Sequence, residues 1–571
     1  MPEQRNLILA IVISILIILG FQYFYELPRM QQAQLEAERR AAQQEMLDEA
    51  LPPTPSGAVD GAPAGVDAAE AVVEAPRLAI EGTRVKGSIS LAGGRIDELR
   101  LLDYRETLDP ASPLVEVLTP IGRESPYFAE FGWVAESADV VVPDNEALWS
   151  ADATTLTTNR PVTLTWDNGD DLRFERQIAV DDDFLFTVTQ SVTNRGNEPV
   201  TLYPYGLISR WGEVPTLGFW ILHEGPIGVL EGTLHELGYD DLREDGEIPF
   251  QSEGGWLGIT DKYWLTALIP DQADALEANF RFIDRGPEGR YQTDFLRSPV
   301  VIAPGETVEV TDRLFAGAKE VILLERYGRE LGLQLFDRAV DFGWFWFLTK
   351  PFFHILHWLF AVTGNYGVAI LILTLLVKIV FYPLANKSYV AMSQMKKLQP
   401  EMMKIRERYE NDREKMNQEM MALYKKEKVN PASGCLPIVV QIPVFFALYK
   451  VLFVSIEMRH APFFGWVQDL SAPDPTTIFN LFGILPFDVP LWIPAIGVWP
   501  IVMGLTMWLQ MKLNPAPPDP IQAKVMAFLP WIFVFLFATF PAGLVIYWAW
   551  NNVLSIGQQW LIMKRMNVKI A

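Results

Sequence analysis

Long apolar segments constrain the fold of this chain more than any other feature. A helix that crosses a bilayer needs about 20 mostly apolar residues. Five apolar segments have about this length or more: residues 7–25, 358–383, 436–455, 493–511 and 525–563. The last is about twice as long as one span requires and is interrupted by Phe540-Pro541-Ala542-Gly543, so we expect two helices there. The sequence therefore predicts a polytopic α-helical membrane protein with six transmembrane helices.

Charge is divided unevenly along the chain. Residues 26–341 contain 26 Lys and Arg against 57 Asp and Glu, whereas all other residues together contain 21 basic and 13 acidic side chains. Such an acidic segment repels the phosphates of a nucleic acid, so we expect that the protein binds no nucleic acid. Cys435 is the only cysteine, which excludes an internal disulfide and a cysteine-rich metal site.

Basic residues near the apolar segments predict the orientation in the membrane. Residues 386–428 contain 11 Lys and Arg, whereas residues 457–492 contain Arg459 alone. Because loops rich in Lys and Arg stay on the cytoplasmic side, we expect both termini and residues 386–428 to lie in the cytoplasm. Residues 26–357 and 457–492 then lie on the opposite side of the membrane.

A region with period-two hydrophobicity follows the first apolar segment. Phe184, Phe186, Val188 and Val192 alternate with more polar residues, and similar short runs are separated by Gly, Asn, Asp and Pro turns. Many short alternating strands without intervening helices are typical of an antiparallel β-sandwich.

Changes in composition mark the predicted parts of the chain. They are an N-terminal transmembrane anchor (1–26), a flexible tether (27–77), the β-sandwich domain with a C-terminal helix (78–340), an aromatic-rich interfacial amphipathic helix (341–357), transmembrane helix 2 (358–383), a cytoplasmic helical hairpin (384–430), transmembrane helices 3–6 (431–563) and a short cytoplasmic tail (564–571).

The predicted hairpin carries methionines at helical spacing on both arms. They are Met392, Met395, Met402, Met403, Met416 and Met420. Apolar stripes of this kind usually pack in the seam between two helices. The alternative is a soft surface that adapts to varied apolar segments of client proteins.

Motifs of catalysis are absent from the sequence. It contains no nucleotide-binding glycine loop, no Gly-x-Ser-x-Gly elbow and no His-Glu-x-x-His motif, and its five histidines form no metal-binding pattern. We therefore predict neither an enzyme nor a cofactor or metal site.

Polar residues inside the apolar segments are the candidate functional residues. Lys378 lies in one segment with Thr374 one turn earlier, Gln441 lies in the next, and Asn551, Ser555 and Gln559 form a stripe in the last. A charge within a span indicates function by default, although Lys378 is close enough to the cytoplasmic end to reach the surface with its stem. The polar groups either bond neighbouring helices together or line a wet cavity.

Two long motifs resemble the signature of the YidC/Oxa/Alb insertase family. One runs from Asn430-Pro431-Ala432-Ser433-Gly434-Cys435-Leu436-Pro437 through Gln441-Ile442-Pro443-Val444-Phe445-Phe446-Ala447-Leu448-Tyr449. The other is Phe540-Pro541-Ala542-Gly543-Leu544-Val545-Ile546-Tyr547, followed by Asn552 and Gln558-Gln559. The resemblance covers about residues 343–563, and the anchor with a large external domain is similar to the Gram-negative subgroup.

This resemblance implies an insertase and chaperone of inner-membrane proteins that acts alone or with the Sec translocon. It implies a hydrophilic groove with a positive charge at Lys378, where bacterial relatives typically have Arg. Thr374, Gln441, Tyr547 and Trp548 match groove or substrate-facing positions. The implied partners are nascent membrane proteins, membrane lipids, and as candidates the ribosome and the signal recognition machinery.

The resemblance also implies that residues 26–357 are periplasmic and that the external domain is similar to a β-supersandwich. Two alternatives stay open at the level of the sequence. A small-solute transporter or channel with an accessory domain fits the polar residues in the spans, although the last five spans contain no interior Asp or Glu for proton coupling. A membrane-anchored carbohydrate-active protein would place its site in the sandwich.

Overall fold

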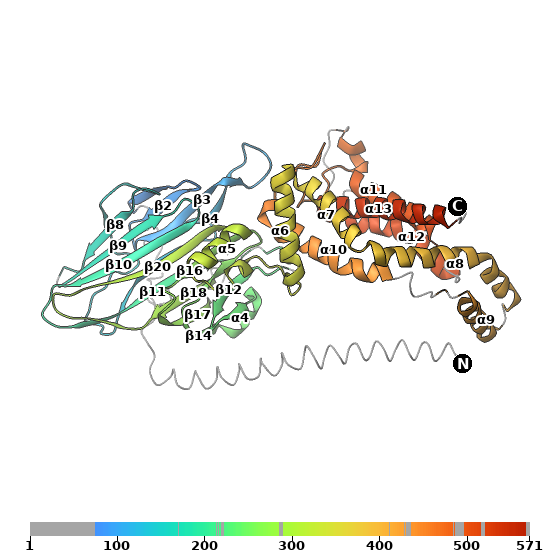
Figure 1. The fold of residues 1–571 in the computed structure, drawn as a ribbon. Coiled ribbons are helices and arrows are strands. Elements are labelled where there is room, and N and C mark those ends of the chain that lie inside the picture. The colour runs from blue at the N-terminus through green and yellow to red at the C-terminus, as the bar shows by residue number, and fades with distance from the viewer. Residues whose placement is uncertain are drawn as a thin grey trace. The chain divides into compact units, whose positions relative to one another are not determined.

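The computed structural model describes residues 75–566, except for 170, 213, 215, 219–221, 285–288, 410–411, 428, 430–435, 484, 486–495 and 515–519. Within these residues the chain forms two compact units, a β-rich unit that ends at Asp341 and a helical unit that begins at Phe342 (Figure 1). The predicted anchor (1–26), most of the predicted tether (27–77) and residues 567–571 lie outside the described residues.

The β-rich unit is a sandwich of two sheets, as the period-two pattern predicts. Among the described residues the first sheet has eleven strands, in the order β14 (Glu247–Glu253), β17 (Ala275–Ile283), β18 (Arg290–Arg297), β11 (Val200–Trp211), β5 (Tyr127–Ala135), β3 (Arg95–Arg105), β2 (Val85–Ser90), β1 (Arg77–Glu81) and β7 (Thr155–Thr157), with β4 (Leu114–Leu118) beside β3 and β19 (Val300–Ile302) beside β11.

The second sheet has nine described strands. Their order is β13 (Thr233–Glu236), β12 (Gly225–Leu230), β15 (Trp256–Thr260), β16 (Trp264–Ile269), β20 (Thr307–Ala318), β10 (Leu185–Asn194), β9 (Leu172–Val180), β8 (Val162–Asp167) and β6 (Ser150–Ala151). The strands pair antiparallel, apart from β1 and β7, which pair in parallel. Thr155–Thr157 reaches the edge of the sheet as a short separate strand, so a purely antiparallel pattern does not hold at this edge.

The sandwich core follows the alternation of the strands. Phe186, Val188 and Val192 of β10 are fully buried, as is Gln190 on the same face, while Thr187, Thr189 and Ser191 on the other face are partly exposed. Gly317 of β20 is required here, because a Cβ at this position would lie 2.3 Å from the ring of the buried Phe184. Apolar burial of this kind is the main stabilising contribution to the unit.

A buried ion pair joins the two sheets. Nη1 of Arg297 on β18 donates to Oδ1 of Asp312 on β20 at 3.2 Å, and Arg297 also contacts Asp274. Burial raises the pKa of the Asp312 carboxyl to about 6, although the nearby Arg297 guanidinium acts in the opposite direction. The pair therefore contains a carboxylate whose ionisation is costly in the folded state.

Three helical segments complete this unit: α4 (Tyr239–Asp245), α5 (Val321–Glu330) and the 3-10 helix η4 (Phe336–Ala339). Arg84, which directly precedes β2, links α5 to the strands, because its guanidinium contacts Asp183 at 2.9 Å and also Glu320, which precedes α5. The C-terminal helix predicted for the β-sandwich domain thus corresponds to α5, which is followed by η4.

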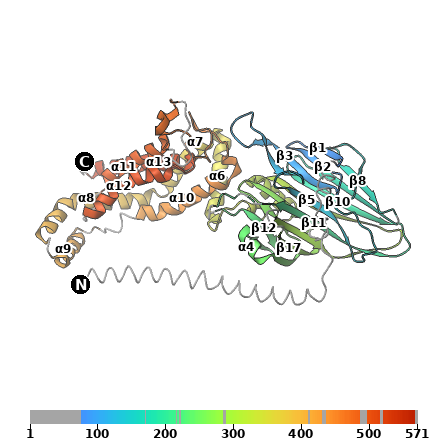
Figure 2. The ribbon, with the colours of Figure 1, turned by 180° about the vertical axis from the view of Figure 1, so that it is seen from behind.

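The helical unit contains eight described α-helices and two 3-10 helices (Figures 1 and 2). They are α6 (Trp346–Thr363), α7 (Tyr366–Val380), α8 (Tyr382–Arg408), α9 (Arg413–Lys426), α10 (Leu436–Val454), η6 (Ile456–Met458), η7 (Ile478–Gly483), α11 (Val498–Leu513), α12 (Pro520–Phe537) and α13 (Ala542–Arg565). Helix α8 leads away from the other helices to α9 at one end of this unit.

The segment predicted as one span, 358–383, is divided among three helices: it contains the end of α6, all of α7 and the first two residues of α8. Gly364 ends α6 in the left-handed conformation with φ of 68°, and Asn365 begins α7 by accepting a hydrogen bond from the Val368 amide. Helix α6 therefore extends to Thr363, beyond the predicted interfacial helix 341–357, and it continues through Pro351. A glycine that favours positive φ and an Asn N-cap explain the break.

The predicted transmembrane spans do not correspond to single helices of the expected length and hydropathy. Within the described part of the chain, no one helix is both long and apolar enough to cross a membrane, whereas α7 and α8 meet this criterion as a pair bent by 71°. The chain turns between α12 and α13 at the Phe540-Pro541 position, and between α8 and α9 before Asp412, whose side chain caps α9.

Candidate functional site

A small cavity lies between α7, α8, α10 and α13. Its volume is about 50 Å³. Its lining brings together five of the predicted groove residues with neighbouring apolar and aromatic groups: Thr374, Val377, Lys378, Phe381, Leu384, Ala385, Tyr389, Gln441, Val444, Tyr547 and Asn551. Residues from four helices that are far apart in the sequence thus form one partly polar site.

Lys378 supplies the positive charge of the cavity. Its Nζ donates to Oγ of Ser555 on α13 at 2.7 Å, and this hydroxyl donates to the Asn551 carbonyl at 2.8 Å. No carboxylate of the described residues forms an ion pair with Lys378. A partly buried ammonium group whose partner is a neutral hydroxyl can still pair with an anionic group.

The polar stripe of α13 faces its helix neighbours along its length. Tyr547, Asn551, Ser555 and Gln559 follow each other at intervals of four residues and are 1–5% exposed. The first two line the cavity and the third holds Lys378. Gln559 instead donates to Oδ1 of Asn514 at 3.0 Å, so it ties α13 to the end of α11, and its own Oε1 is buried without a hydrogen-bond partner in the described chain.

Of the predicted groove residues Thr374 and Trp548, only Thr374 lines the cavity. The Thr374 hydroxyl lines the cavity but donates to the Ile370 carbonyl of its own helix at 2.6 Å. Trp548 does not line the cavity. Its ring packs 4.8 Å from that of Phe445 and 5.3 Å from that of Phe537, in an aromatic cluster between α10, α12 and α13.

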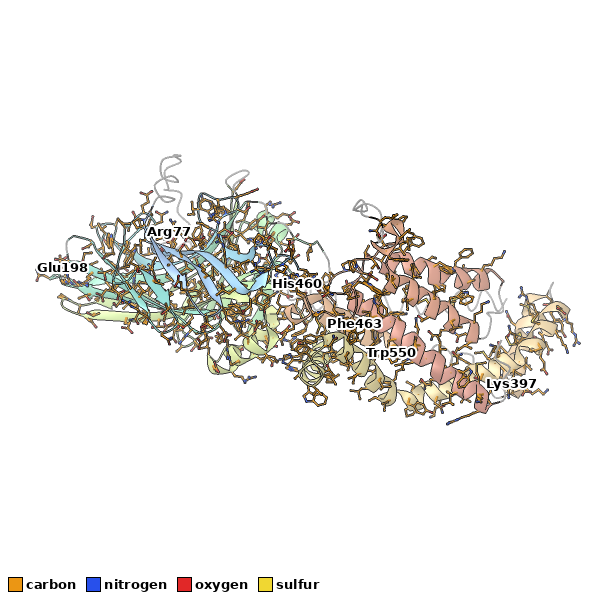
Figure 3. The ribbon with its side chains drawn as sticks, turned by 90° about the horizontal axis from the view of Figure 1, so that it is seen from above. Arg77, Glu198, Lys397, His460, Phe463 and Trp550 are labelled. Atoms are coloured by element: carbon orange, nitrogen blue, oxygen red, sulfur yellow. The ribbon has the colours of Figure 1, made fainter. Side chains whose placement is uncertain are left out.

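Two residues that bear on the site were not predicted from the sequence. Tyr389 lines the cavity from α8, and Trp550 donates its indole N–H to the Leu371 carbonyl at 3.2 Å, which joins α13 to α7 (Figure 3). The i, i+4, i+8 spacing of Phe381, Ala385 and Tyr389 is the signal that places Tyr389 on the cavity face.

Hairpin methionines occupy different environments. Met402 is 9% exposed, and the Tyr424 hydroxyl of α9 donates to its sulfur at 3.9 Å, so this residue lies in the seam between the arms. Met403 is 56% exposed. Partly buried positions are taken by Met392, Met395, Met416 and Met420. The hairpin therefore has both a packed seam and an exposed apolar surface.

The described residues contain no group of three His, Cys, Asp or Glu that could hold a metal ion. The chemistry of the site therefore rests on a fixed cation, hydroxyl and amide groups, and apolar walls. Such a site can attract and solvate polar groups inside an apolar helix bundle.

Comparisons with known proteins assign both units. Residues 77–355 match the family model of the YidC periplasmic domain, and residues 358–569 match the 60Kd inner membrane protein family. Full-length relatives include the membrane protein insertase YidC of Methylobacterium radiotolerans, 49% identical, and that of Nitrobacter hamburgensis, 51% identical. Each alignment covers 100% of this chain and 96% of the relative. This chain belongs to the YidC family of membrane protein insertases.

Among solved structures, an active YidC insertase with its first transmembrane domain resolved matches over 84% of this chain and 92% of its own, with 17% identity and a TM-score of 0.36. Membership of the YidC family confirms the insertase interpretation and the inner-membrane location. The protein inserts other membrane proteins and is not an enzyme. Its β-rich unit corresponds to the periplasmic domain of YidC.

Proposed function

We propose that the cavity around Lys378 is the hydrophilic groove through which the polar tail of a nascent membrane protein enters the bilayer. The observation that carries this proposal is the Lys378 ammonium, which lies in a cavity of the helical unit and is bound to the Ser555 hydroxyl rather than to a carboxylate. An acidic residue of a client can therefore replace Ser555 as its partner and gain a charge-assisted hydrogen bond.

In the proposed topology the chain crosses the membrane six times, both termini lie in the cytoplasm, and residues 26–357 lie in the periplasm. The groove then opens toward the cytoplasm near Lys378. Moving a polar tail through lipid leaves backbone and side-chain groups without partners, at several kcal/mol each. Hydroxyl and amide groups of Tyr547, Asn551 and Gln441 shorten this barrier, because a tail that reaches them is already partly through the membrane.

Insertion needs a driving force, and no nucleotide motif supplies one. Transfer of the client's apolar segment into lipid provides about 0.8 kcal/mol for each CH₂ group. The membrane potential adds about 2.3 kcal/mol per 100 mV for each negative charge that moves to the positive outer side. Lys378 would hold an acidic tail at the entrance until the apolar segment leaves sideways into lipid.

The hairpin α8–α9 makes the first contact with clients in this scheme. Its exposed Met403, and the partly buried Met392, Met395, Met416 and Met420, offer flexible apolar side chains that adapt to different segments. Met402 serves the seam of the hairpin. The Sec translocon, the ribosome and the signal recognition machinery are proposed partners at this cytoplasmic side.

Substitution of the cation tests the electrostatic step. In proteoliposomes, Lys378→Gln should slow insertion of a single-span client with an acidic tail, and Lys378→Arg should preserve it because the charge is kept. The matched control is the same client with every tail Asp and Glu changed to Asn and Gln, whose insertion should not depend on the charge at position 378. Equal rates for the acidic client in all three proteins would refute the electrostatic role.

A second measurement locates the client. A photoreactive side chain is placed either at position 441, in the cavity, or at position 548, in the aromatic cluster. The yield of crosslinks from each position to a stalled single-span nascent chain is then compared. We expect crosslinks from position 441 while the client's apolar segment emerges, and weaker ones from 548 because its neighbours Phe445 and Phe537 surround it. Crosslinks from 548 alone would move the client path to the α10–α12 side.

A further inference from the structure

The segment between α10 and α11 ties together the ends of three helices. Asn365, the N-cap of α7, donates to the Phe463 carbonyl at 3.1 Å (Figure 3). The Phe463 ring fills the space above Gly367, where a Cβ would lie 2.0 Å from it. The first two amides of α13, those of Ala542 and Gly543, donate to the carbonyls of Ala472 and Leu470 at 2.7 and 3.0 Å.

The same segment caps α11. Oδ2 of Asp474 accepts from the Trp499 amide at 2.8 Å, and Oγ1 of Thr476 accepts from the Val498 amide at 3.0 Å. Asp474 is 3% exposed, and its other oxygen accepts from the Trp466 indole at 3.1 Å. Residues 461–477 therefore form a fixed cap on the helix N-termini of α7, α11 and α13, which we call the bundle cap.

Large apolar side chains protrude from and next to the bundle cap. Six of them are 38–63% exposed: Phe464, Trp466, Ile478, Phe479, Leu481 and Phe482. In residues 461–485 the only ionisable side chains are Asp469 and Asp474, and Asp474 is buried. An exposed group of this composition is unusual on a surface that meets only water.

Three backbone hydrogen bonds hold the turn that presents these side chains. Phe482 N–H donates to the Thr477 carbonyl at 2.7 Å, Leu485 N–H donates to the Asn480 carbonyl at 3.0 Å, and Ile478 N–H donates to the Ile496 carbonyl at 3.0 Å. Leu481 and Phe482 adopt left-handed φ of 52° and 60°, a conformation that is unfavourable for residues with a Cβ. The turn thus accepts strain and directs two apolar side chains outward.

We infer that these six side chains insert into the outer leaflet of the bilayer and fix the bundle cap to it. Hydrogen bonds join the cap to the first turn of α11, and the exposed side chains Leu505, Trp508 and Leu509 farther along that helix are also apolar, as expected of a lipid-facing side. Aromatic residues favour the membrane–water interface. Backbone in that layer has to be hydrogen-bonded within the protein, as in this turn.

This inference rests on the proposed topology, which places residues 457–492 outside the cytoplasm. Its consequence for insertion is mechanical. The leaflet holds the bundle cap, and the cap holds the N-termini of α7 and α13, the helices that carry Lys378 and the polar stripe of the cavity. The far end of the cavity walls is thereby kept in place while the cytoplasmic end receives a client.

The test uses the full chain with Cys435→Ser and one new cysteine carrying an environment-sensitive fluorophore. Phe464→Cys and Phe482→Cys probe the apolar group, and Gln468→Cys is the matched control on an exposed polar position of the same cap. In vesicles of phosphatidylethanolamine and phosphatidylglycerol, quenching by lipids with a nitroxide on the acyl chain should be several-fold stronger at 464 and 482 than at 468. Iodide should show the reverse order.

Equal access of iodide to all three positions would overturn the inference. Protection from iodide without quenching by nitroxide lipids, changing with the protein-to-lipid ratio, would also overturn it and would indicate a second copy of the chain as the occupant. An impermeant maleimide applied to Gln468→Cys from each side of the membrane tests the topology separately. Lys378→Gln should leave the quenching and maleimide signals unchanged, because they do not depend on the groove. Failure of the groove proposal can therefore be distinguished from failure of this inference.

Discussion

At the scale of single residues, helix geometry decides which sequence-predicted residues reach the cavity. Tyr547, Asn551 and Ser555 share one face of α13 because they are four residues apart, whereas Trp548 lies about 100° around the helix from Tyr547. The sequence motif contains both residues and does not distinguish their directions. Lys378 could be selected from the sequence because a charge inside an apolar segment is energetically costly. Its partner Ser555 could not, because the two residues are 177 positions apart and meet only through tertiary packing.

Asn365 should be important for the stability of the helical unit. Its side chain accepts from the Val368 amide at 3.1 Å and donates to the Phe463 carbonyl at 3.1 Å. Asn365→Ala removes both bonds, and loss of such a cap costs about 1 kcal/mol. Amide hydrogen exchange in the first turn of α7 should accelerate. Asn365→Asp keeps the acceptor and loses the donor, so it should have an intermediate effect; an Asp variant as fast as Ala would assign no role to the cap.

Asp312 should give the β-rich unit a measurable pH dependence. Burial raises its pKa from 3.8 to about 6, so the folded state keeps the proton longer than the unfolded state. Its contribution to stability is therefore greatest in acid and decreases as the pH rises from about 4 to about 6, by up to about 3 kcal/mol in total. Above that range both states are ionised and the contribution is constant.

Asp312→Asn isolates this effect from those of the other carboxyls. Asparagine does not titrate, so the stability of the variant relative to the parent should rise between pH 4 and pH 7. The measurement is the pH dependence of amide exchange in β20 of the full chain in detergent, corrected for intrinsic exchange. A constant offset from loss of the Arg297 contact is expected as well. Parallel curves for parent and variant would contradict the pKa assignment.

At the scale of elements, two lysines of α8 hold the hairpin against the helix bundle. Nζ of Lys396 lies 3.4 Å from the Lys512 carbonyl at the end of α11, and Nζ of Lys397 donates to the Met566 carbonyl after α13 at 2.7 Å (Figure 3). Cations at helix C-termini contribute about 0.3–1 kcal/mol each, since they satisfy carbonyls and oppose the negative end of the helix dipole.

Loss of these contacts should loosen the hairpin. Lys396→Ala and Lys397→Ala together should increase hydrogen exchange throughout α8 and α9, by up to about tenfold if each contact contributes about 0.7 kcal/mol. Lys404→Ala is the matched control, because this lysine lies exposed on the same helix. Unchanged exchange in the double variant, or the same increase in the control, would show that the two lysine contacts do not hold the hairpin in place.

Element boundaries show where sequence patterns stop being sufficient. The alternation in residues 185–194 identifies β10, because one face of the strand is buried and the other is not. Apolar residues continue through 358–383 without a change in hydropathy, so the break between α6 and α7 is marked by Gly364 and Asn365 alone. Local backbone preference is a weaker signal than hydropathy, but here it decides the geometry.

At the scale of the whole molecule, the acidic segment of the sequence ends at residue 341, where the β-rich unit also ends. The acidic unit has its own core and its own ion networks, such as Arg84 with Asp183 and Glu320. The cavity, the hairpin and the bundle cap all belong to the other unit. Sheet order, with β11 beside β18 and β5, could not be read from the sequence because it depends on pairings between distant strands.

Separation of the units leads to a prediction about insertion. Replacing residues 78–335 with a short flexible linker leaves α6 to α13 unaltered, so Lys378, the hairpin and the bundle cap stay in place. Insertion of an acidic-tailed single-span client should persist at a rate close to that of the full chain, and Lys378→Gln should slow it in both backgrounds. The control is an equal amount of each protein in the membrane with equal nitroxide-lipid quenching at position 464. If insertion disappears although these controls agree, the β-rich unit has to contribute directly to the path of the client, and a groove formed by the helical unit alone is insufficient.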